Sequence, residues 1–166
     1  MARGTPVPSK ADQFAGEWWS KSSAKLPSQL FKQATMLEVT VVSAKELAIG
    51  EFRRRLLDCP AYAAVHADSS AARTGVSSEK GAYNGYRYWG EPVIVTVPAE
   101  CAAIYLEIYC QKHDEPVAAT RVPVGDFNAL PPGELHCLSY RLFDTGPAAG
   151  SRNGVVNITV KRLDGA

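Results

Sequence analysis

The feature that most constrains this chain is a repeated series of short apolar runs, rich in β-branched residues and separated by Gly, Pro, Asn and Asp. The run from Leu37 to Val42 alternates with a period of two, which indicates a strand with one buried face. We predict eight strands, at residues 37–42, 60–66, 72–76, 92–97, 104–110, 117–122, 135–142 and 155–160. Helical periodicity is almost absent from the same region, apart from a short turn expected at 124–130. Regularly spaced short strands over about 130 residues predict an all-β, antiparallel two-sheet sandwich.

The first 35 residues differ in character from the rest of the chain. Residues 1–35 hold five Lys and Arg against two Asp and Glu, a net charge of +3, whereas residues 36–166 hold 13 against 15, a net charge of −2. We therefore predict an irregular or partly helical tail at 1–35, flexible or packed on the sandwich, and a single domain at 36–166. In a short helix Trp18 and Trp19 would lie on one aromatic face, which makes them candidate partner-binding or membrane-anchoring residues. The alternative is that they fold back on the sandwich or stay disordered.

Composition and cysteine placement narrow the class of protein. The formal net charge of +1 argues against nucleic acid as a partner. The apolar runs are too short to span a bilayer, and the first residues lack the apolar core of a secretory signal. The four cysteines form no Cys-x-x-Cys motif and lie in or beside apolar runs, so we expect buried free thiols in a reducing compartment. These cysteines are Cys59, Cys101, Cys110 and Cys137.

Several segments resemble the strands of plant C2 domains. These segments are Leu37–Leu47, Tyr62–Val65, Trp89–Glu91, Tyr105–Tyr109 and Val117–Val124. The resemblance implies an eight-stranded antiparallel C2-type β-sandwich and covers residues 36–164. It also implies a module that binds membranes or proteins rather than one that catalyses a reaction.

The last third of the chain narrows the resemblance to one subfamily. Leu130–Leu142 and Arg152–Val160 are similar to the corresponding segments of the small plant C2 proteins called BON-association proteins. That resemblance implies a copine-like partner, a role in plant defence and cell-death regulation, and a cytoplasmic location peripheral to the plasma membrane. We leave self-association open. The alternative function is a protein–protein adaptor with no lipid affinity.

The resemblance also places a calcium site, which this sequence has largely lost. Calcium needs six to eight oxygen ligands, supplied in the family by two acidic loops. Here the family's acidic positions fall on Pro60 and on Cys110–Lys112, where a lysine would repel the ion. The acidic residues that remain for a weak or vestigial calcium site are Glu51, Asp58, Asp114 and Glu115. We therefore expect calcium-independent or weakly calcium-responsive behaviour and no other cofactor.

The first loop offers a direct route to membranes in place of calcium. Three consecutive arginines follow an aromatic residue and precede a leucine, and a lysine lies in the other loop; the candidate membrane-binding residues are Phe52, Arg53, Arg54, Arg55, Leu56 and Lys112. Each basic residue contributes about 1 kcal/mol near an anionic surface. The alternative is that Leu56 and Leu57 cover the end of the sandwich while the arginines are solvated. We expect no catalysis, because Cys110, His113 and Asp114 come with no oxyanion hole or cleft.

Overall fold

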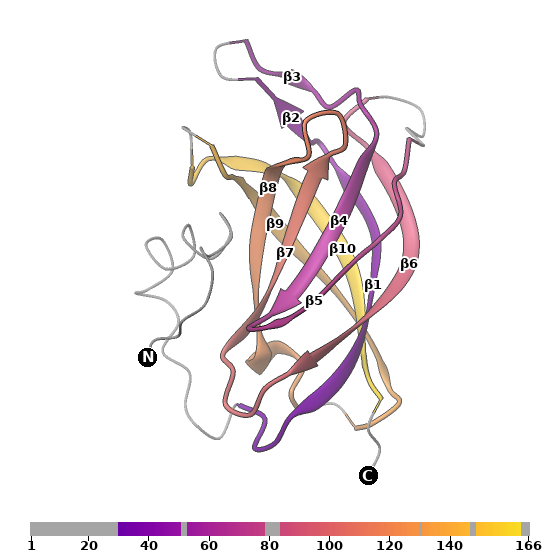
Figure 1. Cartoon of the computed structure of the whole chain (residues 1–166), viewed down its shortest axis with the longest axis vertical. Coiled ribbons are helices and arrows are strands. Elements are labelled where there is room, and N and C mark those ends of the chain that lie inside the picture. The colour runs from indigo at the N-terminus through magenta and orange to yellow at the C-terminus, as the bar shows by residue number, and fades with distance from the viewer. Residues whose placement is uncertain (1–29, 51–52, 79–83, 130, 147–148, 164–166) are drawn as a thin grey trace.

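The computed structural model, shown in Figure 1, describes residues 30–50, 53–78, 84–129, 131–146 and 149–163. Eight strands form one antiparallel sheet in the order β5-β4-β7-β8-β9-β10-β1-β6. Their bounds are β1 (Thr35–Lys45), β4 (Ala61–Ala67), β5 (Ser70–Arg73), β6 (Arg87–Val97), β7 (Ala103–Cys110), β8 (Glu115–Pro123), β9 (Leu135–Asp144) and β10 (Arg152–Arg162). The remaining strands, β2 (Ala48–Ile49) and β3 (Arg55–Leu56), pair as a separate ribbon, and a single 3₁₀ turn, η2 (Val124–Asp126), follows β8.

The large sheet folds over into two layers. Strands β8 and β9 pair only through Ala118 with Asp144 and Ala119 with Phe143. At this short seam the sheet divides into the layers β5-β4-β7-β8 and β9-β10-β1-β6, which lie one in front of the other in Figure 1. The predicted eight-stranded sandwich is confirmed, because each predicted range overlaps one strand of this sheet. The β2–β3 ribbon was not predicted, since strands of two residues leave no alternation to detect.

The core between the layers follows from the alternation in the strands. In β1 the side chains of Leu37, Val39 and Val41 are fully buried, while the intervening residues are partly or fully exposed. Phe31, within the predicted tail, also belongs to the core, because its ring lies 6.1 Å from that of Phe127 and is 6% exposed. Trp18 and Trp19 lie outside the described residues.

A glycine lets the start of β10 lie against the end of β1. The register of β10 shifts between Arg152 and Val155, and Gly154 within this bulge has a φ of +92°. A Cβ atom on Gly154 would lie 2.5 Å from the carbonyl oxygen of Lys45. Both the backbone conformation and the close approach therefore require glycine here.

The prediction of four buried free thiols is wrong. Cys59 and Cys110 form a disulfide whose Cα atoms are 6.4 Å apart, and Cys137 is exposed. Cys101 remains a half-buried free thiol. The pairing has a topological cause: Cys59 precedes β4, Cys110 ends β7, and these neighbours run antiparallel, so both cysteines reach the same end of the sandwich.

Candidate membrane-binding end of the sandwich

The candidate site lies at one end of the sandwich, which we call the loop end. It consists of the β2–β3 ribbon, residues 57–60, residues 84–86 and the β7–β8 turn at 111–114, at the top of Figure 1. Three segments of the loop end are joined by backbone hydrogen bonds. Leu57 N donates to Leu47 O at 2.8 Å, Gly85 N to Leu57 O at 2.8 Å, and Leu47 N to Gly85 O at 3.0 Å. Because the Leu47 and Leu57 side chains are also fully buried, these segments are fixed to the core.

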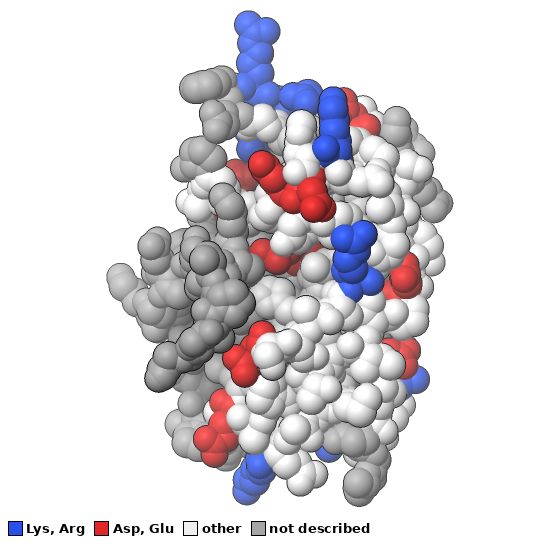
Figure 2. Space-filling model, viewed as in Figure 1, with Lys and Arg blue, Asp and Glu red and all other residues white. Residues whose placement is uncertain are grey.

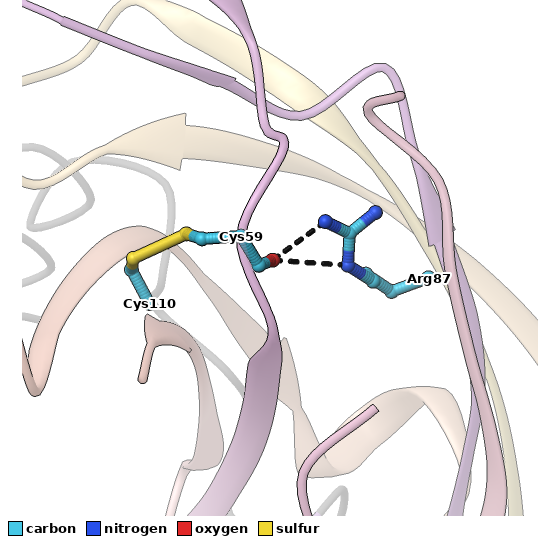
Figure 3. Close-up of a disulfide and its surroundings, with 3 residues drawn as sticks. All are labelled: Cys59, Arg87 and Cys110. Atoms are coloured by element: carbon cyan, nitrogen blue, oxygen red, sulfur yellow. Dashed lines mark hydrogen bonds between the residues drawn. A yellow bond between two sulfur atoms is a disulfide. The ribbon is translucent and has the colours of Figure 1, made fainter. Parts of the chain in front are cut away.

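The disulfide and a buried arginine hold the centre of the loop end (Figure 3). The Cys59–Cys110 bond joins residues 57–60 to the end of β7, and Gln111 N donates to Pro60 O at 2.9 Å beside it. Arg87, at the start of β6, is fully buried and donates from Nε to Cys59 O at 3.1 Å and from Nη2 to the same oxygen. Its Nη1 donates to the carbonyl of Tyr86. Two main-chain carbonyl groups therefore bind a buried cationic side chain at the loop end.

Burial lowers the pKa of Arg87 from its ordinary value, and the charge of Asp58 opposes that shift. An arginine side chain nevertheless stays protonated in proteins at neutral pH. The loop end thus contains a permanent positive charge that the protein cannot release. A charge of this kind disfavours a second cation nearby.

The predicted calcium ligands that the structure describes are not grouped with one another as a metal site. Asp114, in a left-handed turn with a φ of 54°, accepts a hydrogen bond from the hydroxyl of Tyr62. Asp58 and Glu115 are exposed, and Glu51 lies outside the described residues. Across the part of the chain that the structure describes, no three His, Cys, Asp or Glu residues are grouped so as to hold a metal ion. Together with the buried Arg87, this arrangement disfavours a tight calcium ion among the described residues.

The candidate basic residues have two different roles. Arg53, Arg55 and Lys112 are exposed to solvent, whereas Arg54 forms an ion pair with Asp144 at 3.0 Å and donates to Gly50 O at 3.0 Å. The Asp144 side chain is 8% exposed and also accepts from Asn153 Nδ2 at 2.9 Å. Arg54 therefore ties the ribbon to β9. Figure 2 shows basic side chains gathered at this end, with acidic side chains next to them.

The two leucines of the first loop also differ from each other in exposure. Leu57 is fully buried and covers the end of the core, as the alternative interpretation predicted for both leucines. Leu56 is 47% exposed, so it remains available to a membrane, and its inner side faces Gly85. Phe52 lies outside the described residues. Arg53, Arg55 and Leu56 are therefore all exposed within four consecutive residues of the chain.

A polar cluster that was not predicted from the sequence lies on the outer face of β4 and β7. The rings of Tyr62 and Tyr109 stack with centroids 4.9 Å apart, and the guanidinium of Arg73 lies 4.1 Å from the Tyr62 ring centre. Tyr109 donates to the buried carboxylate of Glu107 at 3.1 Å, and His66 Nε2 lies 3.6 Å from the same group. This cluster anchors Tyr62, which in turn holds Asp114. The alternation Tyr-x-Glu-x-Tyr at 105–109 was the signal that could have revealed it.

Arg87 and the Cys59–Cys110 pair were also missed. Arg87 belongs to a tyrosine-rich stretch just before the predicted strand 92–97. In the structure β6 begins five residues earlier than predicted, at Arg87 itself. The cysteine pair could have been inferred from strand order, because the two residues flank strands that are adjacent and antiparallel.

Comparisons with known proteins agree with this architecture. No family model matches the chain, and no curated protein matches it. Among solved structures, it is similar to a C2 domain-containing protein of a proposed elicitor-responsive gene, with 17% identity, 87% of this chain and 96% of that chain covered, and a TM-score of 0.61. It is similar to the C2A domain of plant extended synaptotagmin 1, with 13% identity, coverage of 79% and 95%, and a TM-score of 0.57.

A third similar structure is a calcium-bound C2A and C2B fragment of extended synaptotagmin 2, with 12% identity, coverage of 93% and 48%, and a TM-score of 0.55. Identities this low concern the fold only. Within the described residues there is also no helix that is long and apolar enough to cross a bilayer. The backbone likeness and the sheet order together show that this chain has the C2 fold, an all-β sandwich of eight antiparallel strands.

Proposed function

We propose that this chain is a non-catalytic C2 module that docks on anionic phospholipid surfaces through its loop end without a tightly bound calcium ion. One observation carries the proposal: Arg53, Arg55 and Leu56 are all exposed within four consecutive residues of the loop end. The buried cation Arg87 supports calcium independence, because it is bound by the carbonyls of Cys59 and Tyr86 at the loop end and its charge disfavours a second cation nearby. The proposed location is the cytoplasmic side of the plasma membrane.

The expected affinity is modest. Each exposed basic residue contributes about 1 kcal/mol near an anionic surface, so Arg53, Arg55 and Lys112 together supply about 3 kcal/mol. Burial of the Leu56 side chain in the bilayer interface adds about 1.5–3 kcal/mol at most. Salt screens the charge contribution, with a Debye length of about 8 Å at physiological ionic strength. Binding should therefore require acidic lipid and weaken as salt is added.

Vesicle sedimentation tests the proposal. The full chain should sediment with vesicles of phosphatidylcholine and phosphatidylserine, much less with phosphatidylcholine alone, and equally with calcium or a chelator. The double variant Arg53→Glu and Arg55→Glu should lose binding by roughly tenfold or more, because each change removes an attraction of about 1 kcal/mol and adds a repulsion.

A variant with the same change in net charge supplies the control. Lys32→Glu with Arg121→Glu places both changes at the opposite end of the sandwich, before β1 and beside the start of β7. This control should bind like the unchanged chain. Equal loss in both variants would show that net charge alone drives binding, and loss with chelator would overturn calcium independence.

We extend the proposal to recruitment of a copine-like partner in plant defence or cell-death regulation. Its support is the resemblance of residues 130–142 and 152–160 to the BON-association proteins. Co-sedimentation of a purified copine-type protein with vesicle-bound chain tests it, and failure of the partner to co-sediment would contradict it.

A protein–protein adaptor without lipid affinity is the second candidate. Large apolar side chains are exposed on three strands of the second layer: Met36 is 44% exposed, Ile94 50% and Leu135 57%. Exposed apolar side chains on a sheet face suit a protein surface. Absence of vesicle binding under every condition, together with retained partner binding, would favour the adaptor.

A further inference from the structure

The Cys59–Cys110 disulfide joins the two segments that carry the proposed lipid-binding cations. Cys59 follows Arg55 by four residues and Cys110 precedes Lys112 by two residues. The two cysteines are 51 residues apart in sequence, so the bond fixes one segment against another that is distant along the chain.

Noncovalent contacts around the disulfide would survive its reduction. Arg87 holds the Cys59 carbonyl, Gln111 N donates to Pro60 O, and Leu57 keeps its backbone hydrogen bonds to the neighbouring loops. Beyond Leu57 both residues of β3 are exposed, and the contact that ties the ribbon to β9 is the partly exposed ion pair between Arg54 and Asp144. Breaking the disulfide should therefore loosen the loop end without unfolding the sandwich.

We propose that Cys59 and Cys110 form a reversible redox modification site that controls the order of the loop end. In the oxidised form the arginine-bearing ribbon and the Lys112 turn are held in one arrangement, and in the reduced form the ribbon is loosened. Disulfides in reducing compartments are characteristically transient and regulatory. The effect on lipid docking rests on the proposed function above, whereas the effect on loop order does not.

The exchange chemistry requires only a dithiol reductant. Cys59 is half-buried and Cys110 is 3% exposed, so a reductant thiolate attacks Sγ of Cys59. The S–S bond breaks, its electron pair leaves on Sγ of Cys110, and that thiolate takes a proton. The second thiol of the reductant then attacks its own sulfur in the mixed disulfide and releases Cys59 as a thiol. Two electrons and two protons reach the protein, and the reductant becomes a cyclic disulfide.

Two readouts on the full chain test the inference. The protein is oxidised with oxidised glutathione or reduced with dithiothreitol, and the state of each cysteine is read by alkylation and mass spectrometry. Limited trypsin digestion then measures cleavage after Arg53 and Arg55, and sedimentation with phosphatidylserine vesicles measures docking. Reduction should speed cleavage at these arginines and weaken docking by about two- to tenfold, the effect of ordering roughly one long side chain.

Cysteine variants supply the controls. Cys59→Ser with Cys110→Ser should match the reduced protein under both conditions, whereas Cys101→Ser with Cys137→Ser should keep the full response. If the double variant of the pair fails to fold, the comparison of oxidised with reduced wild-type protein still decides. Absence of a Cys59–Cys110 bond after oxidation, or cleavage that is unchanged by reduction, would overturn the inference. Faster cleavage on reduction with no vesicle binding in either state supports the redox site and contradicts the lipid function.

Discussion

Arg87 holds the carbonyl oxygen of Cys59 with two nitrogens of its guanidinium, and Nε lies 3.1 Å from that oxygen. The two residues are 28 positions apart in sequence, so the contact links β6 to the segment that leads into β4. An arginine that is fully buried is retained only when its donors are satisfied. The loop end is therefore organised around an internal cation.

Removal of the Arg87 guanidinium should destabilise the fold. Arg87→Met leaves the carbonyls of Cys59 and Tyr86 without their donors, and we expect the free energy of unfolding to fall by about 2–4 kcal/mol. Urea denaturation measures the change. Arg73→Met is the matched control, because Arg73 is exposed over the Tyr62 ring and such a contact is worth about 0.5–1 kcal/mol. Equal losses in the two variants would contradict the role assigned to Arg87.

Substitutions of two neighbouring arginines should have different effects, one on the stability of the fold and the other on lipid binding. Arg54→Gln breaks the ion pair with Asp144 and should lower the free energy of unfolding by about 1 kcal/mol, since Arg54 is partly exposed. Arg53→Gln should leave stability within about 0.5 kcal/mol and weaken vesicle binding. Denaturation curves and sedimentation on the same two proteins check both effects. A stability loss in Arg53→Gln that exceeds the loss in Arg54→Gln would disagree with the observed pairing.

The bulge in β10 should tolerate no side chain. Gly154→Ala combines a left-handed backbone with a Cβ atom 2.5 Å from Lys45 O, and we expect a loss of about 2–4 kcal/mol. Gly133 has a similar φ of +85° but nothing within 4 Å of its Cβ position, so Gly133→Ala should cost only about 1 kcal/mol. Thermal unfolding of both variants gives the comparison. Similar melting temperatures would mean that the approach to Lys45 can relax.

Stability should fall at alkaline pH. Burial is the largest cause that raises the pKa values of Tyr140 and Tyr109 above 10.0, and hydrogen bonds to Asp126 and Glu107 add to it. Below pH about 10 both tyrosines are protonated in the folded and unfolded states, so their contribution is fully present there. Above that pH the unfolded state ionises first, and the contribution is lost as pH rises toward the folded-state pKa.

Tyr140→Phe should therefore reduce the alkaline loss of stability. Urea midpoints measured between pH about 8 and about 11 give the comparison. Identical pH profiles for unchanged protein and Tyr140→Phe would contradict the assignment.

The strands could be predicted from sequence because burial on one face imposes a period of two. Leu37, Val39 and Val41 show it directly, and short apolar runs separated by Gly, Pro, Asn and Asp located the other strands of the main sheet. The β2–β3 ribbon was not predicted, since its pairing is set by the backbone contacts of Leu47, Leu57 and Gly85 rather than by a local sequence pattern.

Much of the candidate site could not be predicted for a related reason. Arg54 and Asp144 are 90 residues apart, and nothing in either neighbourhood distinguishes the arginine that pairs from the two that are exposed. The burial of Arg87 depends on carbonyls that only the folded loops bring together. The disulfide between Cys59 and Cys110 could have been predicted, because adjacent antiparallel strands place both cysteines at the same end of the sandwich.

The exposed thiol of Cys137 gives the chain a natural attachment point for a reporter group. In the oxidised protein Cys59 and Cys110 are blocked, and burial raises the pKa of Cys101, whose Sγ also donates to the carbonyl of Ala103. A maleimide dye should therefore react first at Cys137, near the start of β9. Quenching of the dye's fluorescence by quenchers attached at known depths in a bilayer would then report how the domain, with no residue substituted, is tilted when it binds the membrane.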